Sequence, residues 1–299
     1  MYKYDETLKL GIIQTTVDLT TAWNYSGNPK HKMNPYAEKS VMEEIRYAFK
    51  GFYELSESAP RIVILPEYSI PHSGVKAIEK YAKAIDAVVI GGCDLFVNAK
   101  NQAQNKGIIV IPNKWPKPES AYSTTKFYFG KKYFSVLELK FFDKLHVEAK
   151  PEALTYIIDA GKYGNIGVAI CADFYDIERF LIYKGKIHHL IIIAYNKDTK
   201  SFNFLTEAIS RLLLCNVVIC NTGHYGDSLV FSPYDKEWKR TIYKSSGSKI
   251  FTSQVLELPV RALNEEQEKA HDMYQRDIFP SSKDNIFKWP PGYAKFKCK

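Results

Sequence analysis

Three residues suited to acyl-transfer chemistry each stand beside a predicted strand. Glu67 follows an apolar strand that stops at Pro66, and Cys171 directly follows the apolar run at 166–170. Lys126 belongs to a third, weaker strand candidate. In open α/β sheets, ligands gather outside the carboxyl ends of the strands. We therefore expect the carboxylate, the thiol and the amine to meet at one site.

The three groups have complementary chemical abilities. A cysteine between a strand and a helix start experiences a positive potential that favours its thiolate. A carboxylate can take the thiol proton as general base, and an ammonium can stabilise the oxyanion formed by attack on a carbonyl. Taken singly, each residue has an ordinary structural reading, since a buried Cys usually packs as a small hydrophobe and a Lys usually faces solvent. Only their combination predicts an acyl-transfer site without histidine.

Strands and helices alternate along the chain, which predicts a layered α/β domain over residues 1–260 and a C-terminal extension over 261–299. Asn34 and Pro35 predict a helix start, and the short helix after the cysteine is expected to bury Ile177, Phe180 and Leu181 on one face. Further helices are predicted at 75–85 and 202–216, and strands near 8–14, 62–65, 87–92, 107–111, 122–128, 154–159, 166–170, 190–193, 217–220, 228–231 and 254–258.

Composition excludes several classes of protein. The 299 residues are 45% hydrophobic and 25% charged, as in ordinary globular proteins, and no apolar run is long enough for a membrane helix. The N-terminus has no apolar signal core, so a cytoplasmic location is expected. Five scattered cysteines predict neither a disulfide framework nor a zinc site, and the adjacent His188 and His189 would point to opposite faces of a strand. We expect no metal and no cofactor.

The order of these motifs resembles the nitrilase superfamily of carbon–nitrogen hydrolases over roughly residues 8–260. The matching segments are the first strand with Gln14, Leu65-Pro66-Glu67, the Asn-led strand at 105–113, the nucleophile segment at 164–173, Ala194-Tyr195-Asn196, the stretch from Arg211 to Asn216, and Asn221 with Gly226 and Ser228. The resemblance implies an αββα four-layer sandwich with two mixed β-sheets.

The resemblance also implies a catalytic triad of Glu67, a lysine and Cys171. Lys126, Lys140 and Lys144 are candidates for the lysine; Lys126 lies 21 residues after Asn105, whereas Lys144 lies 39 after it. We assign Lys126, because Lys144 leaves little room for a strand before Cys171.

Four further positions have roles that the resemblance implies. Glu138 would be the second glutamate, which orients the lysine and the substrate. The backbone N–H of Ala172 would contribute to the oxyanion site, and Tyr195 and Asn196 would contact substrate. The chain departs from the family in the segment after Glu67, in the residues after Cys171 and in an insert at 16–34.

The predicted reaction is hydrolysis of a non-peptide C–N bond in a small amide through a thioester. Transfer of the acyl group to an amine, and a catalytically silent scaffold or binding protein, are the alternatives. Half of the net charge of +8 lies at 281–299, which holds five lysines and one aspartate beside Trp289 and Tyr293. Such a tail could pack on a partner subunit in a homodimer or larger oligomer, as the resemblance favours, or bind single-stranded nucleic acid. A similarity to domains of some bacterial defence reverse transcriptases keeps a nucleic-acid-linked role open.

Overall fold

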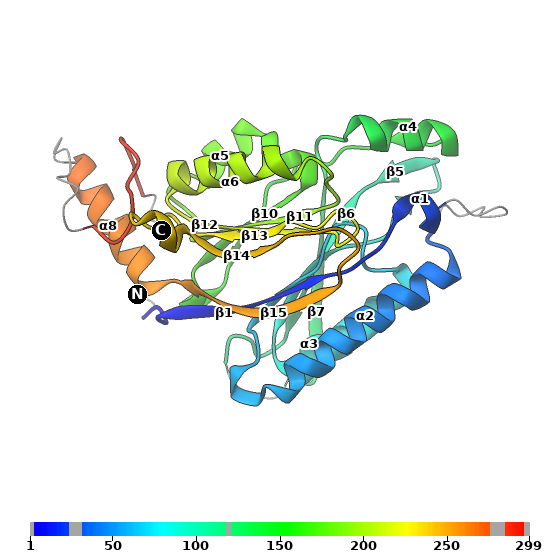
Figure 1. The fold of residues 1–299 in the computed structure, drawn as a ribbon, viewed down its shortest axis with the longest axis horizontal. Coiled ribbons are helices and arrows are strands. Elements are labelled where there is room, and N and C mark those ends of the chain that lie inside the picture. Colours follow the sequence, from blue (N-terminus) through cyan, green and yellow to red (C-terminus); the bar gives the residue numbers. More distant parts are fainter. Residues whose placement is uncertain (1–2, 24–31, 118–120, 276–284, 296–299) are drawn as a thin grey trace.

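Two six-stranded mixed sheets pack face to face, with helices covering both outer surfaces (Figure 1). The computed structural model describes residues 3–23, 32–117, 121–275 and 285–295. The predicted insert and the C-terminal extension are therefore described only in part, and Phe296 and Cys298 lie outside the described residues. The predicted αββα sandwich with two mixed sheets is confirmed.

The first sheet has a parallel centre and antiparallel borders. β1 pairs in parallel with β2, and β2 with β3, while antiparallel partners flank this trio. The strand order is β15 (Thr252–Pro259), β1 (Thr7–Gln14), β2 (Ile62–Ile64), β3 (Val88–Gly92), β6 (Lys106–Pro112) and β7 (Thr124–Gly130).

The second sheet repeats this arrangement. β10, β11 and β12 are parallel, with Ile166 opposite His189 and His189 opposite Asn216, and antiparallel strands lie on both sides. The order is β14 (Thr241–Ser245), β13 (Ser228–Phe231), β12 (Asn216–Asn221), β11 (His189–Ala194), β10 (Asn165–Ile170) and β9 (Ile157–Asp159). A small third sheet contains β4 (Phe96–Val97), β5 (Gln102–Gln104) and β8 (Glu148–Ala149).

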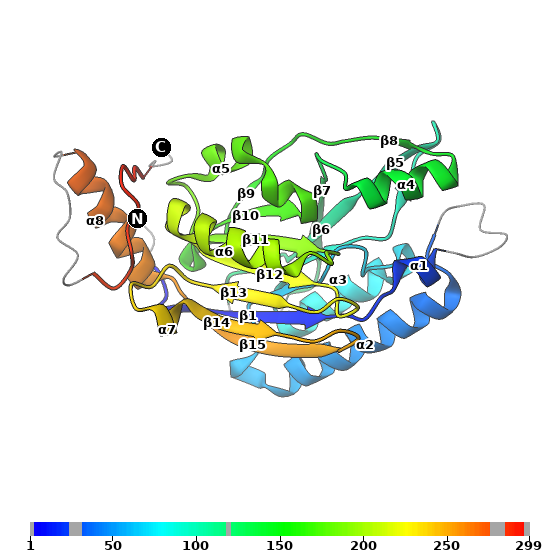
Figure 2. The same ribbon diagram turned by 45° about the horizontal axis from the view of Figure 1, so that its top comes forward.

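Helices lie on both outer faces and at both ends of the sandwich (Figure 2). α2 (Pro35–Glu54) and α3 (Val75–Ile85) cover the first sheet, and α5 (Ile177–Tyr183) and α6 (Thr199–Leu213) cover the second. The remaining helices are α1 (Leu19–Ala22), α4 (Val136–Leu145), α7 (Glu237–Arg240) and α8 (Arg261–Gln275).

Alternation along the strands builds two core layers. In β1, Leu8, Leu10 and Ile12 point between the sheets, whereas Ile13 packs toward the layer of α2 and α3. The Asn34 side chain caps α2 as predicted, accepting a hydrogen bond from the Ala37 N–H at 2.9 Å.

The predicted buried face of α5 is wrong in two of its three positions. Phe180 is buried, but Ile177 is 73% and Leu181 is 68% exposed. The residues that face the sheet are instead Arg179, Phe180 and Tyr183. A helix of seven residues completes only two turns, so its apolar pattern is too short to fix its orientation.

The described part of the C-terminal extension folds back on the same chain. Phe287 and Tyr293 are fully buried in a cluster with Leu214 and Leu263. Gln267 on α8 donates hydrogen bonds from its side-chain amide to the carbonyls of Ile187 and Leu214. The aromatic rings of Phe287 and Tyr293 are thus occupied inside the chain, and stacking on bases would require their release. No helix in the described ranges combines the length and apolarity needed to span a bilayer.

Both adjacent histidines are buried with hydrogen-bonded rings. Nδ1 of His188 accepts from the Asn165 N–H, and Nε2 of His189 lies 2.9 Å from the Tyr163 carbonyl. Burial lowers the pKa of His188 to about 3, with the positive charges of His189 and Lys295 adding to the effect, and burial lowers the pKa of His189 to about 4.

We predict that acid destabilises the protein through these rings. In the unfolded chain both histidine rings take up a proton below their ordinary pKa near 6.5, whereas in the folded chain they stay neutral until a much lower pH. Each ring's contribution to stability therefore declines as the pH falls from about 6.5 toward 4. The expected slope is about 1.4 kcal/mol per pH unit for each ring. Urea unfolding at several pH values should show a shallower decline for His189→Gln than for the wild type. An unchanged slope would contradict this account.

Candidate active site

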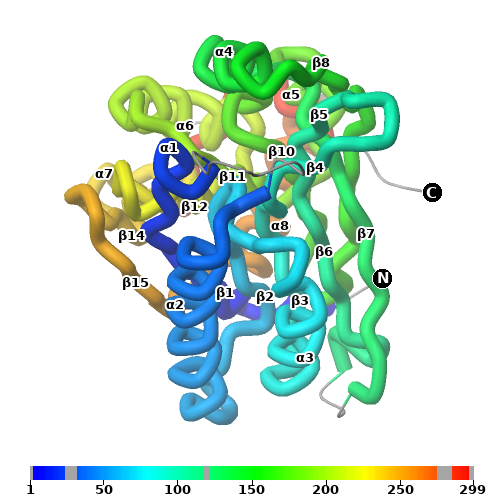
Figure 3. The backbone as a smooth tube through the Cα atoms, turned by 90° about the vertical axis from the view of Figure 1, so that its right-hand side faces the viewer, coloured from blue at the N-terminus to red at the C-terminus, as the bar shows by residue number. Residues whose placement is uncertain are grey.

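The carboxyl ends of both parallel trios lie at one end of the sandwich. This end faces the viewer in Figure 3, with α1 and α4 beside it. Glu67 follows β2 by three residues, and Cys171 directly follows β10. Gly92 allows the Glu67 segment to pass close to β3, because a Cβ there would lie 2.4 Å from the Glu67 Cα.

A buried lysine, Lys131, bridges two glutamates at this end. Its Nζ donates to Oε1 of Glu67 at 2.7 Å and to Oε2 of Glu138 at 2.6 Å. The Lys131 side chain has no exposed surface. Its backbone N–H donates to the Asn105 carbonyl, which continues the ladder between β6 and β7 by one residue.

Two neutral side chains complete the carboxylate cluster. The side-chain amide of Asn105 donates to Oε1 of Glu67 at 2.6 Å and to Oε1 of Glu138 at 2.8 Å. The Tyr68 hydroxyl donates to the same Oε1 of Glu138 at 2.8 Å. Charged groups this deeply buried are tolerated when they are paired and hydrogen-bonded. These contacts therefore fix both carboxylates around the ammonium group.

The first turn of α4 carries Glu138 into the cluster. Ser135 caps the helix by accepting from the Glu138 N–H, while Oε2 of Glu138 accepts from the Ser135 N–H at 2.8 Å. This capping box satisfies two helix-end donors reciprocally. The same Oε2 accepts from Lys131, so one carboxylate both caps α4 and holds the lysine.

Cys171 is held in a strained conformation beside this cluster. Its φ is +45°, a left-handed value that is costly for a residue with a side chain and that occurs preferentially at functional sites. Burial raises the pKa of the Cys171 thiol well above its ordinary value; the negative charge of Glu67 adds to this, and the positive charge of Lys131 opposes it. The thiol is therefore protonated at rest, and its ionisation requires a base.

The environment separates the two carboxylates by function. Burial raises the pKa of Glu67, against the opposing charge of Lys131. Burial also acts to raise the pKa of Glu138, but the charge of Lys131 and the hydrogen bonds lower it below its ordinary value. For Lys131, burial favours the neutral amine, and the charges of Glu138 and Glu67 outweigh it and raise its pKa. Glu67 is thus suited to exchange protons, while Glu138 and Lys131 stay charged.

The structure does not bring Lys126 to the site. Its Nζ pairs with Glu79 of α3 at 2.5 Å, and its side chain is 43% exposed. Lys126 and Lys131 are separated by five residues, an odd number, and side chains at such a spacing point to opposite faces of a strand. Lys126 therefore lies on the helix-covered outer face, away from Glu67, whereas Lys131 lies beside Glu67 and Glu138.

The other predicted site residues lie near the cluster in different ways. The Tyr195 N–H donates to Oε2 of Glu67 at 2.7 Å. Ala172 follows Cys171 in a short 3-10 helix. The side chain of Asn196 is directed to its own turn, where its amide donates to the Asp198 carbonyl. Among the residues that the structure describes, no group of three or more His, Cys, Asp or Glu side chains could hold a metal ion.

Sequence reasoning missed Lys131, Tyr68 and the bridging role of Asn105. One signal was present: Lys131 directly follows the last residue of β7, at the carboxyl end of a strand parallel to β3, whereas Lys126 lies within the strand. Because ligands gather outside the carboxyl ends of strands, a lysine just past a strand end is favoured over one within the strand, and this favours Lys131.

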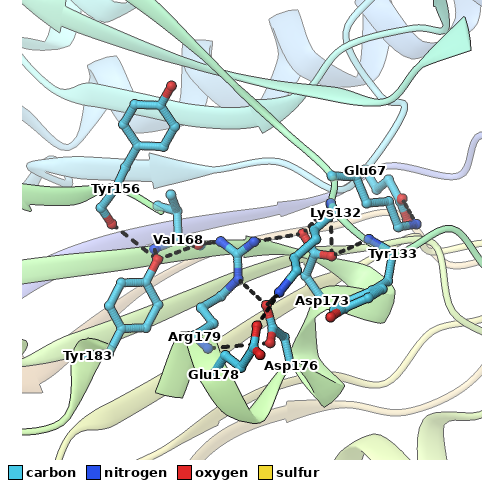
Figure 4. Close-up of polar contacts among 11 residues, drawn as sticks. Glu67, Lys132, Tyr133, Tyr156, Val168, Asp173, Asp176, Glu178, Arg179 and Tyr183 are labelled. Carbon is cyan, nitrogen blue, oxygen red and sulfur yellow. Dashed lines mark hydrogen bonds and ion pairs between the residues drawn. The ribbon is translucent and has the colours of Figure 1, made fainter. Parts of the chain in front are cut away.

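A third buried carboxylate, Asp173, connects the segment that follows Lys131 to the segment that contains Cys171 (Figure 4). Asp173 lies two residues after Cys171 and accepts hydrogen bonds from the backbone N–H groups of Lys132 and Tyr133 at 2.8–3.1 Å. Arg179 of α5 donates to the same carboxylate at 3.1 Å. The two segments come from different sheets, so Asp173 fixes the position of one relative to the other.

Comparison with solved structures identifies the architecture. Nit3 from Saccharomyces cerevisiae, described as a member of branch 10 of the nitrilase superfamily, is similar with a TM-score of 0.62 and 15% identity over 90% of this chain and 96% of its own. XC1258 from Xanthomonas campestris, a CN-hydrolase superfamily protein with an arsenic adduct in its active site, gives a TM-score of 0.57 and 15% identity over 93% and 100%. The chain has the nitrilase-superfamily fold.

Another structure with the nitrilase fold is a mutant of the amidase from Nesterenkonia sp. AN1, with an acetamide moiety covalently added at the active-site cysteine. Its TM-score is 0.58, with 10% identity over 92% of this chain and 99% of its own. No family model and no curated protein matches the sequence. The similarity therefore establishes the fold, and the chemistry must be argued from the residues.

We predict that Asp173→Asn destabilises the protein strongly. Every hydrogen-bond partner of the Asp173 carboxylate among the described residues is an N–H donor, so the amide of Asn would face at least one of them with its own N–H groups. Arg179 would also lose its closer buried anion and keep only Asp176, at 3.7 Å. Breaking such a buried pair typically costs about 3–5 kcal/mol. Glu178→Gln is the matched control, because Glu178 pairs with Lys132 in the same network but is 79% exposed. Urea unfolding should place the control within about 0.5 kcal/mol of the wild type, and equal losses in both variants would contradict the prediction.

Proposed function

We propose that the protein hydrolyses a carbon–nitrogen bond in a small, non-peptide amide through a thioester on Cys171. The observation that supports this most directly is the buried Lys131 ammonium, held by Glu67 and Glu138 next to the thiol. A nucleophile, a base with a raised pKa and a permanent cation in one buried cluster are the elements that acyl transfer needs.

The first half of the reaction forms the thioester. Glu67 takes the proton of the Cys171 thiol as the sulfur attacks the amide carbonyl. Lys131 and the Ala172 N–H stabilise the negative charge that develops on the carbonyl oxygen. Glu67 then gives the proton to the nitrogen, the C–N bond breaks, and ammonia or an amine leaves.

The second half releases the acid. Glu67 takes a proton from a water molecule as its oxygen attacks the thioester carbonyl, and the same donors stabilise the second oxyanion. The C–S bond breaks, and the sulfur recovers its proton from Glu67. Glu138 remains ionised and holds Lys131 throughout, so the only net change is addition of water across the C–N bond.

We predict opposite outcomes for the two lysines. Lys131→Gln should slow thioester formation about 10²–10³-fold, because the oxyanion loses its cation. Glu67→Gln should slow it about 10²–10⁴-fold through loss of the base, and Cys171→Ala should abolish it. Lys126→Gln, which removes a lysine paired with a glutamate at the surface, should stay within about two-fold. The measurement is mass spectrometry of the protein mixed with a panel of simple amides, together with product release.

Two results would overturn the assignment. One is undiminished turnover in Cys171→Ala. The other is iodoacetamide labelling in which Cys171 reacts no faster than Cys215, as expected of a silent scaffold.

A homodimer through α5 and α6 is part of the same proposal. The two helices lie side by side: Phe202 of α6 contacts Phe174 in the short 3-10 helix before α5, and Phe174 in turn contacts Phe180 of α5. Apolar side chains at helical spacing point outward from both: Ile177 and Leu181 on α5, and Phe204 and Leu212, 70% and 57% exposed, on α6. Exposed apolar patches of this kind mark association surfaces, and a second copy of the chain would cover them.

Leu181→Glu should convert the dimer to a monomer. A buried, unpaired carboxylate in each half of the interface costs several kcal/mol, which lowers the association constant by orders of magnitude. Sedimentation velocity at micromolar concentration measures this. Tyr47→Glu is the control, because Tyr47 is 70% exposed on α2, on the opposite face. Identical sedimentation of wild type and Leu181→Glu would contradict the dimer interface.

A further inference from the structure

A fully buried aspartate, Asp94, fastens the segment around α1 to the sandwich. Its carboxylate accepts from the indole N–H of Trp23 at 2.8 Å, from the Met33 N–H at 2.7 Å and from the Leu95 N–H at 2.8 Å. Asp94 has no exposed surface, and Trp23 is only 6% exposed. Three hydrogen bonds to one buried carboxylate fix the indole in position and orientation.

Trp23 packs against Tyr68, which hydrogen-bonds Glu138, and against α4, the helix that carries Glu138. Its ring meets Tyr68 edge-on with centroids 4.7 Å apart, and the Tyr68 hydroxyl donates to Oε1 of Glu138. Its ring also contacts that of Phe141, with centroids 4.6 Å apart, on the turn of α4 that follows Glu138. The indole thus touches both the residue that hydrogen-bonds the carboxylate and the helix that carries it.

Residues before Trp23 in the same segment contact Tyr195, whose backbone hydrogen-bonds Glu67. The Leu19 N–H donates to the Tyr195 hydroxyl at 3.0 Å, and the Tyr195 N–H donates to Oε2 of Glu67. The Thr222 hydroxyl donates to the Val17 carbonyl and anchors the segment to the second sheet. The segment 15–23 therefore connects the surroundings of both carboxylates at the end of the sandwich seen in Figure 3.

We propose that Trp23, held by Asp94, is a positioning residue for Glu138. Resting on the proposed function, the inference is that the indole keeps Tyr68 and the first turns of α4 in place, so that Glu138 holds Lys131 where the oxyanion forms. Lys131 has only two carboxylate partners within hydrogen-bond distance among the described residues, so a displacement of Glu138 displaces the ammonium. A shift of about 1 Å in a catalytic group can lower a rate by two orders of magnitude.

The test is a double-mutant cycle on the acylation of Cys171 by p-nitrophenyl acetate. In this probe reaction the thiol gives its proton to Glu67, the sulfur attacks the ester carbonyl, and p-nitrophenolate leaves in a burst that is followed by absorbance. Trp23→Leu should slow the burst about 10-fold or more. In a Glu138→Gln background, Trp23→Leu should cause no further loss, because Trp23 acts through the carboxylate that is already gone. Asp94→Asn should slow the burst in the same direction.

Trp289→Leu is the matched control. Trp289 also donates its indole N–H at 2.8 Å to a buried carboxylate, that of Glu266, but it belongs to the C-terminal cluster. It should leave the burst rate within about two-fold of the wild type, because its hydrogen bond and its packing lie in the C-terminal cluster, at the end of the sandwich opposite Glu138. A loss in Trp289→Leu equal to that in Trp23→Leu, or full additivity of Trp23→Leu with Glu138→Gln, would overturn the proposal.

Two further measurements keep the inference testable. If Trp23→Leu does not fold, Trp23→Phe keeps a six-membered aromatic ring but removes the pyrrole ring with the N–H that Asp94 accepts, and it should still slow the burst. If wild-type Cys171 is not acylated at all, the proposed function fails, and urea unfolding of the same cycle then decides the positioning alone. If the losses of unfolding free energy caused by Trp23→Leu and Glu138→Gln are not additive, the coupling between the two residues is supported. Additive losses would refute it.

Discussion

A lysine ammonium buried between two carboxylates is the interaction on which the candidate site depends. Removing an ion from water costs several kcal/mol, and only close, hydrogen-bonded counter-ions offset this. Lys131 is therefore stable in its position only if Glu67 and Glu138 are both in place, and they in turn rely on Asn105 and Tyr68. The polar groups thus depend on one another, and the arrangement is rigid for that reason.

The geometry of the sandwich explains why this cluster faces a thiol. Glu67 and Lys131 follow strands of the first sheet, whereas Cys171 follows a strand of the second. Neither sheet alone contains both the Cys171 thiol and the Glu67 carboxylate. Their relative position depends on the packing of the two sheets and on Asp173, whose carboxylate bonds the segment after β7 while its backbone belongs to the nucleophile segment.

Outside the site, aromatic residues of the C-terminal extension are buried within the chain, whereas apolar residues of α5 are exposed. In the C-terminal extension, Phe287 and Tyr293 pack inside the chain and help to close the end of the sandwich opposite the site. On α5 the reverse holds, since Ile177 and Leu181 face outward while Arg179 reaches under the helix to Asp173. The need of a buried carboxylate for a cation therefore sets the rotation of α5, and the apolar face it leaves exposed is available to a partner.

The sequence by itself determined the layered α/β architecture, the capped start of α2, and the positions of Glu67 and Cys171 at strand ends. These follow from local physics, because hydrophobic periodicity, capping residues and strand termini are all properties of short segments. Only the tertiary structure decided which lysine is buried and which face of α5 is covered. Lys126 and Lys131 have the same side chain, and what distinguishes them is the set of charges nearby: Glu79 at the surface for one, Glu67 and Glu138 in the interior for the other. Those partners are distant in sequence or lie on another element, so no local pattern could reveal them.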